Sequence, residues 1–234
     1  MVLPAIEDPT IYPTEERVGE DILQRWIVEL LRPLLARWLE QQGNRTFVGA
    51  DQFIYFEQYH PHKRVAPDVY VLPGVPPETE VRSWKTWETG IVPSFAFESV
   101  SQDWQKDYID APVLHAELGT SELIVFDPHY TERREGVRWQ RYNRTSRGKL
   151  EESERTDADR ISSDVLGCFL RVQGVGLQQR VRIATGTAGD EWFRTAEEAE
   201  RLAKDTERRA KEAALDEVET LKRRLAELEG RKRH

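Results

Sequence analysis

The sequence has little sulfur and no long apolar run. Its 234 residues contain one cysteine, Cys168, and one methionine, so neither an intramolecular disulfide nor a cysteine-based zinc cluster can form. We expect Cys168 to be a small buried residue in a reducing, cytoplasmic setting. No apolar stretch approaches the ~20 residues of a membrane span, and the first residues show no signal-peptide pattern, so we expect no membrane association.

An excess of positive charge is also absent. The formal net charge is −8, which argues against a long basic surface that coats nucleic acid, although a local basic groove stays open. Charged residues make up 32% of the chain. That share is high for a globular domain, and the excess lies in the segment that follows residue 194.

This C-terminal segment, residues 195–234, has neither aromatic residues nor proline. Part of it places apolar residues at alternating steps of four and three, the a/d pattern of a coiled coil. This apolar seam consists of Ala214, Val218, Leu221, Leu225 and Leu228. Upstream, charged residues occupy the same register, so the seam is short. Two interpretations stay open: a solvated helix, or a coiled coil that joins a second copy in a homodimer.

Residues 1–15 contain three prolines and are expected to form an extended lead-in, followed by a single domain over residues 16–194. Apolar residues at helical spacing predict a first helix that begins near Thr14 and stops at Gly43. They are Ile22, Trp26, Leu30, Leu34 and Trp38.

Extended patterns dominate the rest of this domain, with one further helix. Strands are expected within 46–59, 64–75, 94–101, 121–128 and 165–183, a hairpin within 135–153, a helix within 106–120, and an irregular connector over 81–93. This order predicts an α/β fold in which helices flank a mixed central sheet.

Two carboxylates occupy positions where a buried charge is expected. Glu98 directly follows the apolar run 95–97, and Asp68 follows Pro67 at the start of a strand. A buried carboxylate is costly unless it is paired, hydrogen-bonded or bound to a metal. If the two strands are neighbours, the carboxylates can share Mg²⁺ or Mn²⁺ and support phosphodiester hydrolysis. A polar turn at Pro67-Asp68 and an arginine partner for Glu98 are the alternatives.

The segments "VAPDVYVLPGV", "SFAFESVSQDWQKDY" and "ELGTSELIVFDP" carry a specific resemblance. Over residues 15–190 the chain resembles the Uma-two family of bacterial restriction-endonuclease-like proteins, in the PD-(D/E)XK nuclease superfamily. The resemblance implies a restriction-endonuclease-like core, a Mg²⁺- or Mn²⁺-dependent endonuclease activity, and nucleic acid, DNA foremost, as the partner. It also implies that Asp68 and Glu98 are the motif acids that hold the metal.

The basic residue of the motif is displaced in this chain. The superfamily places a lysine two residues after the acid, where Val100 stands here, and the family often places it on the next helix, where this chain has Ala111. Asp107 matches the aspartate that supports that lysine. Either Lys106 has taken over the role and orients or activates the attacking water, or the basic residue is missing. In the second case the protein is a catalytically impaired binding or assembly module that acts through its helical tail.

Several other polar residues are weaker candidates. Asp51 and Gln52 could add an oxygen ligand, although a polar turn is the simpler interpretation. Glu29 could face the site from the first helix, but we expect a solvated side chain. Residues 60–64 could form a basic rim for phosphates or an ordinary solvated loop. His115 is expected to be packed rather than catalytic.

Overall fold

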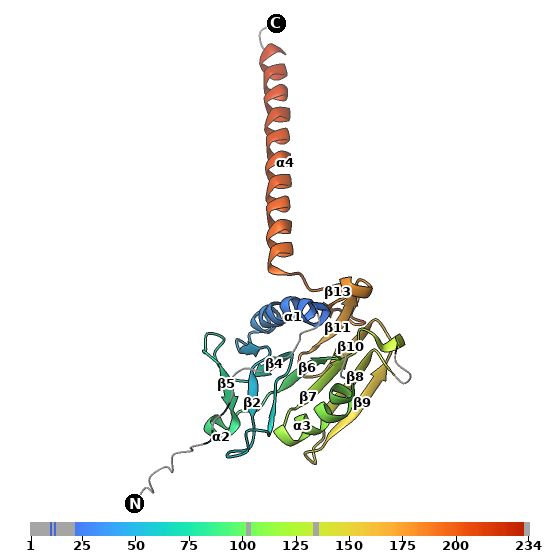
Figure 1. Ribbon diagram of the computed structural model, residues 1–234. Coiled ribbons are helices and arrows are strands. Elements are labelled where there is room, and N and C mark those ends of the chain that lie inside the picture. Colours follow the sequence, from blue (N-terminus) through green and yellow to red (C-terminus); the bar gives the residue numbers. More distant parts are fainter. Residues whose placement is uncertain (1–9, 11, 13–21, 102–103, 133–135, 232–234) are drawn as a thin grey trace, which may run out of the picture. The chain divides into compact units, whose positions relative to one another are not determined.

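The computed structural model describes residues 10, 12, 22–101, 104–132 and 136–231, with the side chains of 225–231 left aside. The chain divides into two compact units, residues 1–193 and 194–234, which are considered separately (Figure 1). The expected lead-in and the predicted start of the first helix lie outside the described residues, apart from Thr10 and Tyr12.

The first unit has a six-stranded sheet and two smaller ones. The six-stranded sheet has the order β1 (Phe47–Gly49), β4 (Val69–Leu72), β6 (Phe95–Ser99), β7 (Glu122–Phe126), β8 (Trp139–Arg144), β9 (Leu150–Thr156). The four-stranded sheet has the order β10 (Arg160–Ser163), β11 (Cys168–Gln173), β12 (Arg180–Thr185), β13 (Glu191–Trp192). The three-stranded sheet has the order β3 (Arg64–Val65), β2 (Phe53–Tyr55), β5 (Ser83–Lys85).

Helices connect and cover these sheets. They are α1 (Ile22–Gln41), α2 (Thr86–Thr89) and α3 (Ala111–Leu118), and the π-helical turn η1 (Lys106–Asp110) leads directly into α3. In the six-stranded sheet, β6 and β7 are parallel and the other neighbours are antiparallel. The helix α3 therefore lies in the crossover between the two parallel strands. The predicted mixed sheet flanked by helices is confirmed.

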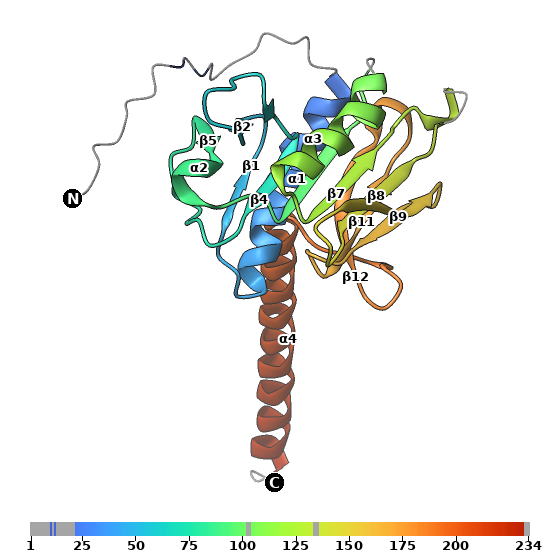
Figure 2. The same cartoon turned by 90° about the horizontal axis from the view of Figure 1, so that it is seen from below.

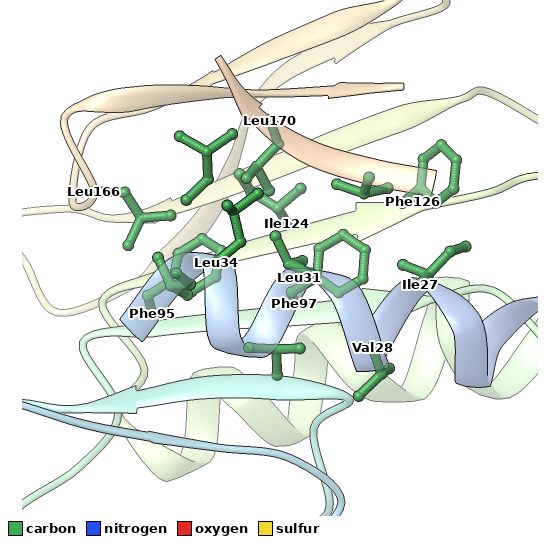
Figure 3. Packing of buried hydrophobic residues seen from close by; sticks show 14 of the residues in the cluster. Ile27, Val28, Leu31, Leu34, Phe95, Phe97, Ile124, Phe126, Leu166 and Leu170 are labelled. Atoms are coloured by element: carbon green, nitrogen blue, oxygen red, sulfur yellow. The ribbon is translucent and has the colours of Figure 1, made fainter. Parts of the chain in front are cut away.

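The main core forms where α1 packs between two sheets. The apolar stripe of α1 contacts phenylalanines on one face of β6 and β7 and aliphatic side chains from the four-stranded sheet, and all of these are buried (Figure 3). They include Ile27, Leu31, Leu34, Phe95, Phe97, Phe126, Leu166 and Leu170. Alternation along β6 sends Phe95 and Phe97 to this face and leaves Ala96 and Glu98 on the other.

The opposite face of the sheet is covered by α3, so the two helices lie on either side of it (Figures 1 and 2). Ala96, Val100 and Val125 form a small buried cluster there, against Tyr108 of η1. The side chain of Arg144 donates to the carbonyls of Thr120 at 2.9 Å and Ala116 at 2.9 Å. A cation thus caps the carboxyl end of α3, where the helix dipole favours positive charge.

One expectation about this unit needs correction. The segment 81–93 is not an irregular connector, because it contains β5 and α2. The predicted hairpin is present as β8 and β9, and Cys168 is buried in β11, where burial raises the pKa of its thiol to about 12.

The second unit is the helix α4 (Ala196–Arg231). Thr195 and Glu198 form a reciprocal capping box at its start: Thr195 N donates to the Glu198 carboxylate at 2.9 Å, and Glu198 N donates to the Thr195 hydroxyl at 3.1 Å. Leu215, Val218 and Leu221 are exposed. Among the described residues, none of the helices is both long and apolar enough to cross a membrane.

Candidate functional site

The strand register brings the two predicted acids together. β4 and β6 are antiparallel, with Val69 opposite Phe97. Asp68 directly precedes β4 and Glu98 follows Phe97 in β6, so extending this register by one step sets Asp68 opposite Glu98. Residues opposite each other on antiparallel strands point to the same face, with Cβ atoms about 4.5–5.5 Å apart. Like charges at such positions repel, so this arrangement is destabilising unless something compensates the charge.

Asp68 is buried, and two donors fix its carboxylate. The backbone N–H of Ser99 donates to Oδ2 at 2.6 Å, and the side-chain amide of Gln24, on the first turn of α1, donates to Oδ1 at 2.7 Å. Each carboxylate oxygen of Asp68 therefore accepts one hydrogen bond from a different element. Pattern reasoning missed Gln24, because it is an ordinary polar position on a helix and its contact spans 44 positions of sequence.

Glu98 is held from the α3 side of the sheet. Its side chain is 14% exposed, and its Oε1 lies 3.1 Å from Nε2 of His115, which is itself wholly buried. The backbone N–H of Asp68 also hydrogen-bonds to the Glu98 carboxylate. The two acids are thus tied to each other's strands through backbone donors as well as by position.

The surroundings of the pair raise the pKa of both carboxyl groups and so favour their uncharged forms. Burial raises the pKa of Asp68 well above its usual range, and the charge of Glu98 raises it further. Burial also raises the pKa of Glu98, and the charge of Asp107 adds to the effect. The Asp68 N–H and the charge of Lys106 lower the pKa of Glu98 again without cancelling the shift. A cation between the two carboxylates would supply the missing positive charge.

The structure places Lys106 and Asp107 at the start of η1, beside this pair. Lys106 is exposed, yet its charge is felt at Glu98. Asp107 is buried, and its Oδ2 accepts hydrogen bonds from the backbone N–H of Ser101 at 2.7 Å and from the Ser101 hydroxyl at 2.8 Å. Asp107 therefore anchors η1 to the segment that leaves β6.

Of the weaker candidates, Asp51 acts on the pair through its charge, and Gln52 contacts Tyr70. The negative charge of Asp51 raises the pKa of both acids. Its backbone has φ of 60°, in the left-handed region that few residues other than glycine adopt. Gln52 accepts a hydrogen bond at 2.9 Å from the hydroxyl of Tyr70, two residues after Asp68. Glu29 is solvated, as expected, and pairs with Arg25 at 2.8 Å.

The segment 60–64 is tied to neighbouring elements. Lys63 contacts Glu117 of α3 at 2.5 Å, and the guanidinium of Arg64 lies 4.3 Å from the centre of the Phe53 ring. His60 lies 3.0 Å from Glu57. Because these contacts pair the positive side chains of the segment with neighbouring groups, they favour an ordinary structural loop over a rim that binds phosphates.

The donor set at the acid pair suits a magnesium-type ion. Within the described residues, no group of three or more His, Cys, Asp or Glu side chains could hold a metal ion. Two carboxylates are nevertheless the usual protein share for Mg²⁺, which keeps several waters and binds substrate phosphates with its other positions. Asp68 and Glu98 therefore fit an ion that is completed by water and phosphate rather than caged by protein.

Comparison with known proteins then identifies the family. A family model named Uma2 and described as "Putative restriction endonuclease" matches residues 15–173, more than half of the chain. The chain belongs to the Uma2 family. The resemblance expected from the sequence is confirmed, and this Uma2 match includes Asp68, Glu98, Lys106 and Asp107 but not α4.

The other comparisons add less. A solved structure described as "a putative nuclease belonging to DUF820 from Anabaena variabilis" has a TM-score of 0.41 and 15% identity to this Uma2 protein. The match covers 69% of this chain and 78% of that one. So remote a likeness carries no weight for fold or function. The comparison with curated proteins found no match.

Proposed function

We propose that this Uma2 protein is a metal-dependent endonuclease that hydrolyses phosphodiester bonds in nucleic acid, with DNA as the first substrate to test. One observation carries the proposal: Asp68, directly before β4, and Glu98 of β6 are held together by backbone donors of each other's segments, and the charge of Glu98 raises the pKa of Asp68. Membership in a family described as restriction endonucleases supports the same chemistry.

Each residue of the site has a separate role in this proposal. Asp68 and Glu98 would hold Mg²⁺ or Mn²⁺, which when bound polarises a phosphodiester and lowers the pKa of a water. Ser99 N–H and Gln24 fix the orientation of the Asp68 carboxylate. Lys106, whose charge already acts on Glu98, would orient the attacking water or stabilise the hydroxide. Asp107 supports it by anchoring the start of η1.

Nicking of supercoiled plasmid by the full-length chain with Mn²⁺ or Mg²⁺ tests the proposal. We expect Asp68→Asn, which keeps size and removes charge, to slow nicking by at least about 100-fold, because loss of a group one shell further out already costs about 10–100-fold. Asp216→Asn, an exposed change on α4 outside the family match, is the matched control and should nick like wild type. Equal rates for Asp68→Asn and wild type would contradict the proposal.

A second candidate function is favoured by the position of the expected lysine. Val100 is only 2% exposed and packs in the apolar cluster under α3, so no charge can be placed there cheaply. A protein with the acids but without an effective base would bind metal and nucleic acid without cutting. Wild type that retards DNA in gels in the presence of Mn²⁺, but leaves plasmid intact at every metal concentration, would support this module.

We further propose that a second copy of the chain is the partner of α4. Of the described members of the apolar seam, Val218 and Leu221 are 47% and 55% exposed, and Ala214 is exposed as well. A homodimer through this seam would bury them, and it is compatible with either candidate function.

A further inference from the structure

His115 has no role in the site as predicted from the sequence, yet both of its ring nitrogens are engaged. The ring is wholly buried on α3. Nε2 lies 3.1 Å from Oε1 of Glu98, and Nδ1 lies 2.9 Å from the hydroxyl oxygen of Thr120, which is also wholly buried. The ring therefore bridges a candidate metal ligand and a hydroxyl at the carboxyl end of α3.

The chemistry of the three groups sets the direction of these hydrogen bonds. A neutral imidazole carries one N–H and one acceptor nitrogen. A Glu98 carboxylate that holds a cation is ionised and can only accept, which requires the proton on Nε2 of His115. Nδ1 must then accept from the Thr120 hydroxyl. The Thr120 hydroxyl can act as that donor, so it satisfies Nδ1 in the tautomer that donates to Glu98.

The backbone of His115 is held as firmly as its ring. Its carbonyl oxygen accepts from the N–H of Gly119 at 3.2 Å and of Thr120 at 3.1 Å, and also from the guanidinium of Arg144 at 3.2 Å. These donors come from the end of α3 and from β8. A ring anchored in this way can impose its geometry on a flexible glutamate side chain, which has three rotatable bonds of its own.

We propose that His115 is a positioning residue that holds Oε1 of Glu98 through Nε2 and so orients this carboxylate toward the cation it would share with Asp68. The inference rests on the proposed function, because it assigns the geometry of the same site. Donation of a hydrogen bond to a metal-bound group from the next shell typically governs metal affinity by about 10–100-fold.

Titration of the full-length protein with Mn²⁺ in a calorimeter tests the inference, with circular dichroism to show that each variant is folded. We expect His115→Met, which fills similar space without a donor, to weaken Mn²⁺ binding by about 10–100-fold. His115→Gln can place an amide N–H near the position of Nε2 and should recover most of the affinity. Thr120→Val leaves the ring in place but removes the hydroxyl that donates to Nδ1, and it should bind with intermediate affinity.

The outcomes separate this inference from the proposed function. If Asp68→Asn abolishes Mn²⁺ binding while His115→Met binds like wild type, His115 has no positioning role and the metal site stands. Equal weakening by His115→Met and His115→Gln would also overturn the hydrogen-bond role. If wild type binds no Mn²⁺, both the inference and the proposed function fall. If His115→Met does not fold, the Mn²⁺ affinity of Thr120→Val tests the inference instead. Wild-type affinity in Thr120→Val would overturn it.

Discussion

A buried carboxyl away from the acid pair adds to the dependence of the fold's stability on pH. Glu122, at the start of β7, accepts hydrogen bonds from the Ser163 hydroxyl, from Asp164 N–H at 2.9 Å and from the Asn143 amide at 3.2 Å. Burial nevertheless raises the pKa of Glu122 above its ordinary value of 4.5. The folded protein therefore binds this proton more tightly than the unfolded chain, and the resulting stabilisation is full below the unfolded pKa and lost as pH rises through the folded pKa.

We expect Glu122→Gln to flatten the fall in unfolding free energy as pH rises above the ordinary glutamate pKa of 4.5, because the variant has no proton to lose there. Urea unfolding across this range measures the slope. Glu151→Gln, an exposed change on β9, is the matched control and should keep the wild-type slope. If Glu122→Gln falls as steeply as wild type, Glu122 is not the source of the dependence.

Individual residues also differ in how well the sequence predicts their place in the site. Asp68 and Glu98 could be singled out because a carboxylate after an apolar run and a Pro-Asp pair are local signals. Gln24 and His115 could not, because nothing local distinguishes a polar residue on a solvated helix face from one that contacts a distant carboxylate. Their contacts to Asp68 and Glu98 span 44 and 17 positions and arise only when helices pack on both faces of the sheet.

At the scale of elements, the close packing of β1 on β4 predicts a glycine position that does not tolerate a side chain. Gly49 of β1 pairs with Tyr70 of β4, and a Cβ at Gly49 would lie 2.5 Å from the Tyr70 hydroxyl oxygen, against the tip of the ring. Tyr70 is wholly buried and donates to Gln52, so its ring cannot swing away freely. We expect Gly49→Ala to lower the free energy of unfolding by about 1–3 kcal/mol, the usual cost of overpacking.

Chemical denaturation of a double-mutant cycle checks this cause. In a Tyr70→Leu background the ring is gone, so Gly49→Ala should cost much less than it does in wild type. An equal cost in both backgrounds would place the strain in the backbone of β1 rather than in its contact with Tyr70.

The elements themselves follow from the sequence where the signal is local. The helical spacing in α1, the apolar run of β7 and the turn at Arg147-Gly148 were sufficient to predict a helix, a buried strand and a hairpin. The prediction for segment 81–93 was wrong because β5 forms only by parallel pairing with β2, where Ser83 lies opposite Phe53. The sequence of this segment is rich in Trp and Thr, but charged residues interrupt it. It therefore has no alternating apolar pattern that would predict a strand with a distant partner.

At the scale of the whole chain, the tail is a unit whose stability and role depend on what covers its seam. An isolated polar helix is marginal in water, so α4 gains from burying apolar side chains against a partner. In the heptad register of the seam, Val218 and Leu221 occupy core positions, while Glu217 and Lys222 flank them at g and e. In a parallel pair, Glu217 of one copy would face Lys222 of the other, a complementary contact that favours a second copy as the partner.

We therefore expect the full-length chain to form a weak, concentration-dependent dimer, because the short seam buries only a few aliphatic groups and ordering two helices offsets part of that gain. Sedimentation equilibrium measures the mass. Leu221→Asp places a charge in the seam and should yield a monomer, whereas Leu202→Asp, outside the seam at an f position, should leave the dimer intact. Deleting residues 196–234 should also yield a monomer that still unfolds cooperatively, since the core of the first unit precedes residue 194. If Leu221→Asp keeps the wild-type mass, or if the truncated chain fails to fold, α4 does not serve as a separate assembly element.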